Sequence, residues 1–230
     1  MLGQILWWSC IAQECVLLIR SAQGRFCRRY SLFYAYLSYV LLGDLLRLYV
    51  YIFHPGSYQN FYWNTQFVSV LLGYGVIWEI YRQALGHYPG AARMARDFLS
   101  VIFILVVSKA FFNTLSGHHV WSPATTTAEL ELNLRSVQAI LLVALGGLLR
   151  YYAIPIGRNL RGMILGYGFF IGTSLINLSF LSRVSEKFHL WWTYLEPVSY
   201  LATLLIWCWA LWSYYPNPQP EKQVFIERDY

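Results

Sequence analysis

The chain has 230 residues, of which 57% are hydrophobic and only 12% are charged, and its net charge is +6 at neutral pH. A soluble domain usually carries about 25% charged residues, so this composition indicates a chain that is surrounded largely by lipid. The positive charges lie in short clusters between apolar runs, and we therefore do not expect nucleic acid as a partner.

Seven apolar runs follow one another along the chain, each of about the length that crosses a bilayer core roughly 30 Å thick. They cover residues 4–20, 31–53, 62–84, 97–114, 133–153, 160–182 and 190–214. Glu14 interrupts the first run, and the short fourth run contains Lys109. The sequence predicts an all-α, polytopic membrane protein, with a bundle of about seven transmembrane helices in residues 1–214 and a short cytoplasmic tail in residues 215–230.

The connections between the runs predict the orientation of the helices. The first, third and fifth connections and the tail carry twelve of the seventeen Lys and Arg residues. The second and fourth connections carry none, and the sixth carries only Arg183 and Lys187. Short loops rich in Lys and Arg stay in the cytoplasm. We therefore expect the N-terminus outside, the C-terminus in the cytoplasm, and a multi-pass location in the inner (cytoplasmic) membrane of a bacterial cell.

The sixth run contains two glycine pairs at the spacing that lets transmembrane helices approach closely. They are Gly162 with Gly166, and Gly168 with Gly172. Ordinary packing inside one bundle is the first interpretation of this pattern. The alternative is an interface with another membrane protein chain.

Ionisable residues inside the runs are the best pointers to a functional site, because each is unfavourable in lipid by about 2.5–3.5 kcal/mol on insertion scales. Asp44 and Arg47 are three residues apart on one predicted helix, and so are Glu79 and Arg82. Side chains at this spacing share a helix face. We expect each of the two to form a structural ion pair.

Four ionisable residues on four predicted helices lie at a similar depth near the outer side: Arg47, Lys109, Arg135 and Glu196. Glu196 precedes Pro197, and proline inside a helix usually kinks it. These four residues are our candidate ligand-binding site, a polar cavity open to the outside. Three cations against one carboxylate would favour an anionic ligand. The alternative is a set of interhelical salt bridges around the mouth of the bundle.

The sequence carries no motif for a metal or another cofactor, and we expect none. No His lies in the middle of a run, where a haem between helices would need its axial ligands, and the last run has no Lys for a retinal Schiff base. The loop histidines His54, His118, His119 and His189 match no metal-ligand spacing. The zinc-protease pattern H-E-x-x-H is also absent.

Two segments carry a resemblance to a known family. Residues 79–90, EIYRQALGHYPG, end the third run, and Arg28-Arg29-Tyr30 precede the second. In these segments and in its overall layout the chain resembles a family of uncharacterised bacterial seven-helix integral membrane proteins. The resemblance implies the architecture alone.

Three interpretations of the function remain open. The one we favour is a non-enzymatic protein, either a receptor-like sensor or an accessory subunit of a membrane protein complex, because the loops are short and catalytic motifs are missing. The second is a transporter of a small anionic solute, although the chain shows no internal repeat of the kind many transporters have. The third is a lipid-modifying membrane enzyme that uses Glu196 or Glu79 as its acid or base.

Overall fold

A computed structural model describes residues 2–24, 26–86, 123–181 and 186–213, together with six single residues between 93 and 108. Its elements are α1 (Leu2–Gly24), α2 (Phe26–Arg29), α3 (Ser31–Phe53), the short 3-10 helix η1 (Pro55–Ser57), α4 (Tyr58–Leu85), α6 (Pro123–Tyr151), α7 (Arg158–Leu181) and α8 (Glu186–Leu211). The prediction of an all-α protein is confirmed for this part of the chain. Most of the predicted fourth run and the whole predicted tail, 215–230, lie outside the described residues.

Five of the described helices are long and apolar enough to cross a membrane, namely α1, α3, α6, α7 and α8. Helix α4 has 28 residues and is also long enough. Polar side chains in its first turns, among them Asn60, Asn64 and Gln66, make it less apolar than the other five. The composition of these helices is that of a membrane protein.

The predicted helix boundaries are most accurate where the helix contains no polar turns beyond the apolar run. The predicted run 31–53 coincides with α3. Helix α6, in contrast, begins at Pro123, ten residues before the predicted start at 133. Apolar residues mark where a helix meets lipid, whereas backbone hydrogen bonds continue through polar residues beyond it. Glu131, which precedes the predicted run 133–153, therefore lies inside α6.

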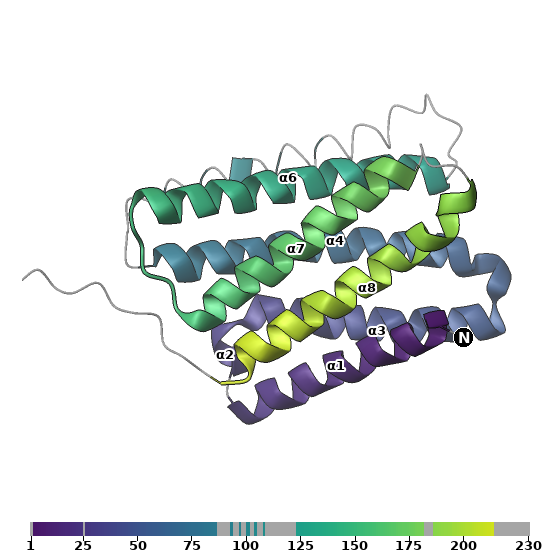
Figure 1. Ribbon diagram of the computed structural model, residues 1–230, viewed down its shortest axis with the longest axis horizontal. Coiled ribbons are helices and arrows are strands. Elements are labelled where there is room, and N and C mark those ends of the chain that lie inside the picture. Colours follow the sequence, from purple (N-terminus) through teal and green to yellow (C-terminus); the bar gives the residue numbers. More distant parts are fainter. Residues whose placement is uncertain are drawn as a thin grey trace, which may run out of the picture.

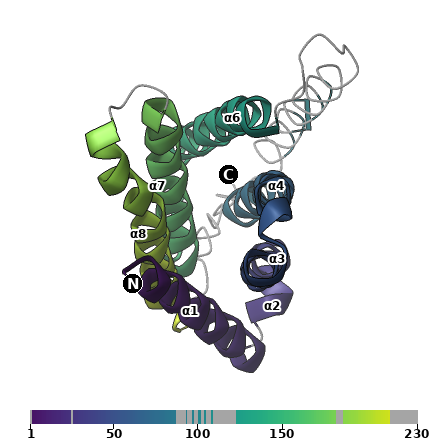
Figure 2. The same cartoon turned by 90° about the vertical axis from the view of Figure 1, so that its right-hand side faces the viewer.

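The six long helices form a closed ring, which Figure 2 shows end-on. Each of them packs against the next in chain order, and α1 packs against α8 to close the ring. Helices α4 and α7 also touch across the interior. Figure 1 shows the same bundle from the side, with the start of α1 at the right. We call that side the N-terminal end of the bundle and the other side the opposite end.

Helices α4 and α6 run parallel to each other. The Tyr74 hydroxyl donates a hydrogen bond to the carbonyl of Leu134 over 2.8 Å, and the Tyr81 hydroxyl donates one to the carbonyl of Leu141 over 2.6 Å. Residue numbers on both helices therefore increase in the same direction. The chain that joins them leaves α4 at the opposite end and enters α6 at the N-terminal end.

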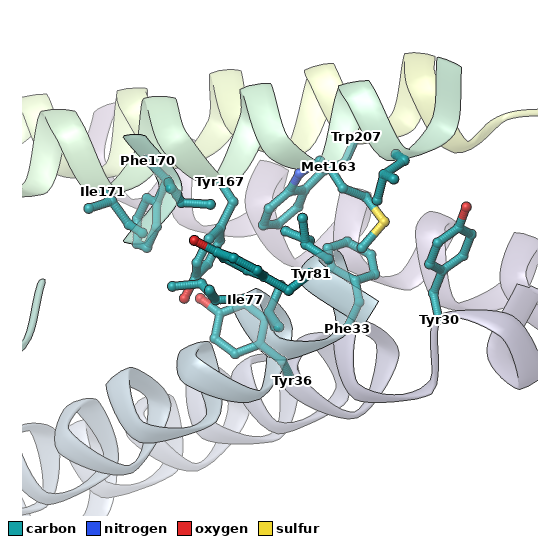
Figure 3. Packing of buried hydrophobic residues seen from close by; sticks show 14 of the residues in the cluster. Tyr30, Phe33, Tyr36, Ile77, Tyr81, Met163, Tyr167, Phe170, Ile171 and Trp207 are labelled. Atoms are coloured by element: carbon teal, nitrogen blue, oxygen red, sulfur yellow. The ribbon is translucent and has the colours of Figure 1, made fainter. Parts of the chain in front are cut away.

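Aromatic rings fill the middle of the ring of helices, as Figure 3 shows. Phe33 of α3 meets Trp207 of α8 edge to face at a centroid distance of 4.9 Å. Tyr36 of α3 meets Tyr167 of α7 in the same way at 6.1 Å. Phe33 and Trp207 are fully buried. These ring pairs join α3 to α7 and α8.

The first glycine pair of the sixth run lets α7 approach α8 closely. A Cβ atom added at Gly162 would overlap the Cβ of Ala210, and one added at Gly166 would overlap the indole of Trp207. Both glycines therefore face α8 of the same chain. This is the ordinary packing that the sequence analysis gave as its first interpretation.

The second glycine pair has more room. A Cβ at Gly168 would lie 4.0 Å from the nearest atom of Leu142, an ordinary contact, and one at Gly172 would have no neighbour within 4 Å among the described residues. An interface with another membrane protein chain therefore stays a prediction for Gly168 and Gly172 alone.

Basic side chains gather at the opposite end of the bundle. Seven arginines belong to helix ends or connections on that side: Arg20, Arg28, Arg29, Arg82, Arg150, Arg158 and Arg161. Two of them stack on exposed tryptophans, Arg20 at 5.5 Å from the ring centre of Trp212 and Arg158 at 4.4 Å from that of Trp209. Tryptophan and arginine favour the level of the lipid headgroups.

Candidate functional site

A cavity of about 630 Å³ lies in the half of the bundle toward its N-terminal end. Helices α1, α3, α4 and α8 form its walls, and Phe170 of α7 also lines it. Its charged lining residues are Asp44, Arg47 and Glu196. Four helices thus contribute to one space, which has the volume of a typical small-molecule site.

Aromatic side chains make up much of the wall of this cavity. Six tyrosines line it: Tyr36, Tyr39, Tyr51, Tyr58, Tyr62 and Tyr200. Trp7 and Phe170 add two further rings. An aromatic wall offers a ligand both apolar contact and the negative faces of the rings.

The guanidinium of Arg47 is held by four partners. It donates to Asp44 over 3.2 Å, to the hydroxyl of Thr65 over 2.9 Å and to the side-chain oxygen of Gln66 over 3.2 Å. It also lies over the ring of Tyr62, 4.8 Å from the ring centre. The predicted ion pair between Asp44 and Arg47 is confirmed.

Arg135 is buried beside the cavity and paired with Glu131 one turn earlier on α6. Its Nε donates to the Glu131 carboxylate over 2.7 Å, and its guanidinium lies 4.9 Å from the ring centre of Phe170. The amide of Gln66 also donates to Glu131 over 2.9 Å. Since Gln66 accepts from Arg47 as well, one hydrogen-bonded network joins the two arginines across α3, α4 and α6.

Glu196 lines the cavity from α8, just before the helix-interior proline Pro197. It accepts a long hydrogen bond, 3.4 Å, from the amide of Asn177 on α7. Glu196 is also close enough to Arg135 and Glu131 for electrostatic interaction. It is the lining carboxyl group that no described cation contacts directly.

Glu14 stands behind the wall of the cavity on α1. It is fully buried and accepts a hydrogen bond from the hydroxyl of Tyr200, a lining residue. Its second oxygen has no hydrogen-bond partner within the part of the chain that the structure describes. The sequence analysis noted Glu14 only as an interruption of the first run, because its contact with α8 depends on how the two helices are rotated.

The four predicted site residues do not all lie at the cavity. Arg47 and Glu196 line the cavity, Arg135 is buried next to it, and Lys109 lies outside the described residues. Each of the two described arginines is already paired with a carboxylate. The expected excess of positive charge is therefore not found among the described side chains, because Glu131 and Glu14 were not counted at this site.

Glu79 is the other residue that the sequence analysis named as a possible acid or base. It interacts with the N-terminus of α3 at the opposite end of the bundle. It is fully buried and accepts the backbone N–H of Phe33 over 2.8 Å. Its predicted ion pair with Arg82 is confirmed at 3.3 Å. A carboxylate at a helix N-terminus satisfies free backbone donors and interacts favourably with the helix dipole.

Within the described ranges, no three His, Cys, Asp or Glu side chains lie together in a way that could hold a metal ion. His118, His119 and the side chain of His189 lie outside those ranges. Comparison of the chain with protein-family models, curated proteins and solved structures finds no match.

Proposed function

We propose that this chain is a multi-pass protein of the inner membrane, with seven spanning helices, the N-terminus outside and the C-terminus in the cytoplasm. We propose further that it is a non-enzymatic, receptor-like protein that binds a small solute in the cavity at the N-terminal end. The cavity, with three charged side chains set in an aromatic wall, is the observation that carries this proposal.

The directions of the helices support seven spans. Because α4 and α6 are parallel, α4 ends at the opposite end of the bundle and α6 begins at the N-terminal end, as an odd number of spans between α4 and α6 requires. The predicted run 97–114 lies within this stretch, and its described residues, such as Val101 and Ile104, are helical. Helix α4 is a ring member between α3 and α6, so it shares their environment despite its polar first turns.

The distribution of charge supports the orientation. The arginines of the helix ends gather at the opposite end of the bundle, and positively charged loops stay in the cytoplasm. The cavity then opens on the outer side of the membrane. A site on that side suits a receptor for an external solute.

The packed interior favours binding over transport. The Tyr36–Tyr167 ring pair lies at the wall of the cavity, which Tyr36 lines, and the Phe33–Trp207 pair packs next to it (Figure 3), three residues earlier on α3 and therefore nearer the opposite end. A transporter needs a path to both sides of the membrane, and these rings occupy the place where such a path would run. Transport would therefore require a rearrangement of the core, whereas binding would not.

A cavity-filling substitution at Gly43 tests the binding proposal. Gly43 lines the cavity, and a Cβ atom added there has no neighbour within 4 Å among the described residues. Gly43→Leu should therefore fill the cavity without disturbing the fold. The purified protein and the variant are heated with a panel of solutes comprising amino acids, carboxylates, quaternary ammonium salts and nucleosides, and the midpoint of unfolding is measured.

We expect at least one class of solute to raise the midpoint of the native protein and not that of Gly43→Leu. The matched control is Gly146→Leu, since Gly146 is exposed on α6 and a Cβ added there also has no neighbour within 4 Å among the described residues. It should respond as the native protein does. If no class of solute raises the midpoint of unfolding, or if all three proteins respond equally, the binding proposal is wrong. A protein that co-purifies in mild detergent would then favour an accessory subunit of a membrane protein complex.

A further inference from the structure

We infer that the cavity selects a small organic cation, a molecule with an ammonium group carried on an apolar body. This inference rests on the proposed function, because it names the class of ligand for the same site. It departs from the anionic ligand that the sequence analysis expected. Three features of the cavity support it: its aromatic faces, its surplus of carboxyl groups and the engaged state of its arginines.

The rings of the cavity already hold cations. Arg47 lies over Tyr62 and Arg135 lies over Phe170, both at less than 5 Å from the ring centre. The negative face of an aromatic ring attracts a cation, and sites for quaternary ammonium groups use several such rings. Further rings line the same space without a cation over them in the described structure.

Tyr51 and Tyr58 are two of those rings. They come from the end of α3 and the start of α4, and their centroids are 5.5 Å apart in an edge-to-face arrangement. Trp7 lines the cavity from α1. Rings from three different helices therefore surround one space, which is the arrangement that an ammonium group with several alkyl substituents requires.

The carboxyl groups outnumber the cations at this site. Asp44 and Glu196 line the cavity and Glu131 and Glu14 stand behind it, whereas the described cations are Arg47 and Arg135 alone. Each of these two arginines is paired, so among the described side chains Glu196 keeps only the long hydrogen bond from Asn177. A cationic ligand would give the Glu196 carboxyl group a positively charged partner.

An anionic ligand would meet the reverse situation. Arg47 already donates to Asp44, Thr65 and Gln66, so an anion would have to displace these hydrogen bonds. Arg135 is 3% exposed and bound to Glu131. A bound anion would also lie beside Glu196, and like charges close together are unfavourable.

Two probes of similar size and opposite charge test the inference. The dissociation constants of phenyltrimethylammonium and of benzoate are measured by titration calorimetry on the full chain in detergent. We expect phenyltrimethylammonium to bind the native protein, Gly43→Leu to lose that binding, and benzoate to bind at least tenfold more weakly. Glu196→Gln should weaken the binding of phenyltrimethylammonium at least tenfold, because it removes the unpaired carboxyl group.

The matched control is Asp97→Asn, which makes the same change of charge at an exposed residue outside the cavity lining. It should bind the probe as the native protein does.

A second variant, Tyr51→Leu, keeps the test independent of the charged network. Tyr51 is 58% exposed, so the substitution should not disturb the fold, and loss of a cation–π partner should weaken binding by about threefold or more.

The outcomes separate the two proposals. Stronger binding of benzoate, abolished by Gly43→Leu, would overturn the cationic ligand and leave the cavity as the binding site. Equal affinity of native protein and Glu196→Gln for phenyltrimethylammonium would also overturn it. If only carboxylates, nucleosides or amino acids of the panel bind, the cation inference fails alone; if no solute binds, both proposals fail.

Discussion

The two arginines at the cavity are balanced by specific neighbours. Arg47 uses a carboxylate, a hydroxyl, an amide and a ring, and Arg135 uses a carboxylate and a ring. An unpaired charge in a low-dielectric interior is strongly unfavourable. The pairing explains how one chain can keep several ionisable groups between apolar helices.

Gly162 provides a test of packing at a single position. Gly162→Ala should lower the free energy of unfolding in detergent by about 1–3 kcal/mol, the usual effect of overpacking, because the new Cβ overlaps that of Ala210. Gly172→Ala on the same helix is the control. It has no neighbour within 4 Å among the described residues, so it should be neutral or stabilising by up to about 1 kcal/mol. Equal effects of the two substitutions would show that the close approach of α7 and α8 is wrong.

The sequence predicted those contacts in which both partners lie on one correctly placed helix. The pair of Asp44 and Arg47 is the example, since a spacing of three residues determines it. The contact of Gln66 with Glu131 was not predictable, because it requires the rotation of α4 and α6 relative to each other. The start of α6 was missed for a different reason, since its first turns are polar.

At the scale of the helix, α1 depends on α8. The Tyr200 hydroxyl donates a hydrogen bond to the buried Glu14 carboxylate, and removal of this hydroxyl leaves a buried polar group without its donor. Tyr200→Phe should therefore lower the free energy of unfolding by about 1–3 kcal/mol. The measurement is a denaturation curve in mixed detergent micelles.

Tyr49→Phe is the control for that substitution, because Tyr49 is 53% exposed and removal of its hydroxyl should leave the stability unchanged. A loss of stability in both variants would point to a general effect of tyrosine hydroxyls at the membrane surface. A loss in neither would mean that Glu14 is not held by α8.

At the scale of the whole molecule, the orientation can be tested from the two sides of the membrane. Single cysteines are placed at positions 60, 126 and 92 of a functional variant without native cysteines. We expect a membrane-impermeant maleimide to label positions 60 and 126 in intact cells and to leave position 92 unlabelled, because α4 and α6 both begin at the N-terminal end. Labelling at 92 alone would reverse the topology, and opposite labelling at 60 and 126 would contradict the parallel packing of α4 and α6.

The closure of the ring by α1 and α8 has a consequence for biogenesis. Glu14 and its donor Tyr200 are separated by 186 positions, and at synthesis rates of about 5–20 residues per second roughly 10 to 40 seconds pass between them. During that time the nascent chain holds a carboxyl group in its first helix before the ribosome has made the hydroxyl that binds it. The synthesis of α1 is thus separated from the completion of its neighbours by the time needed to make the rest of the bundle.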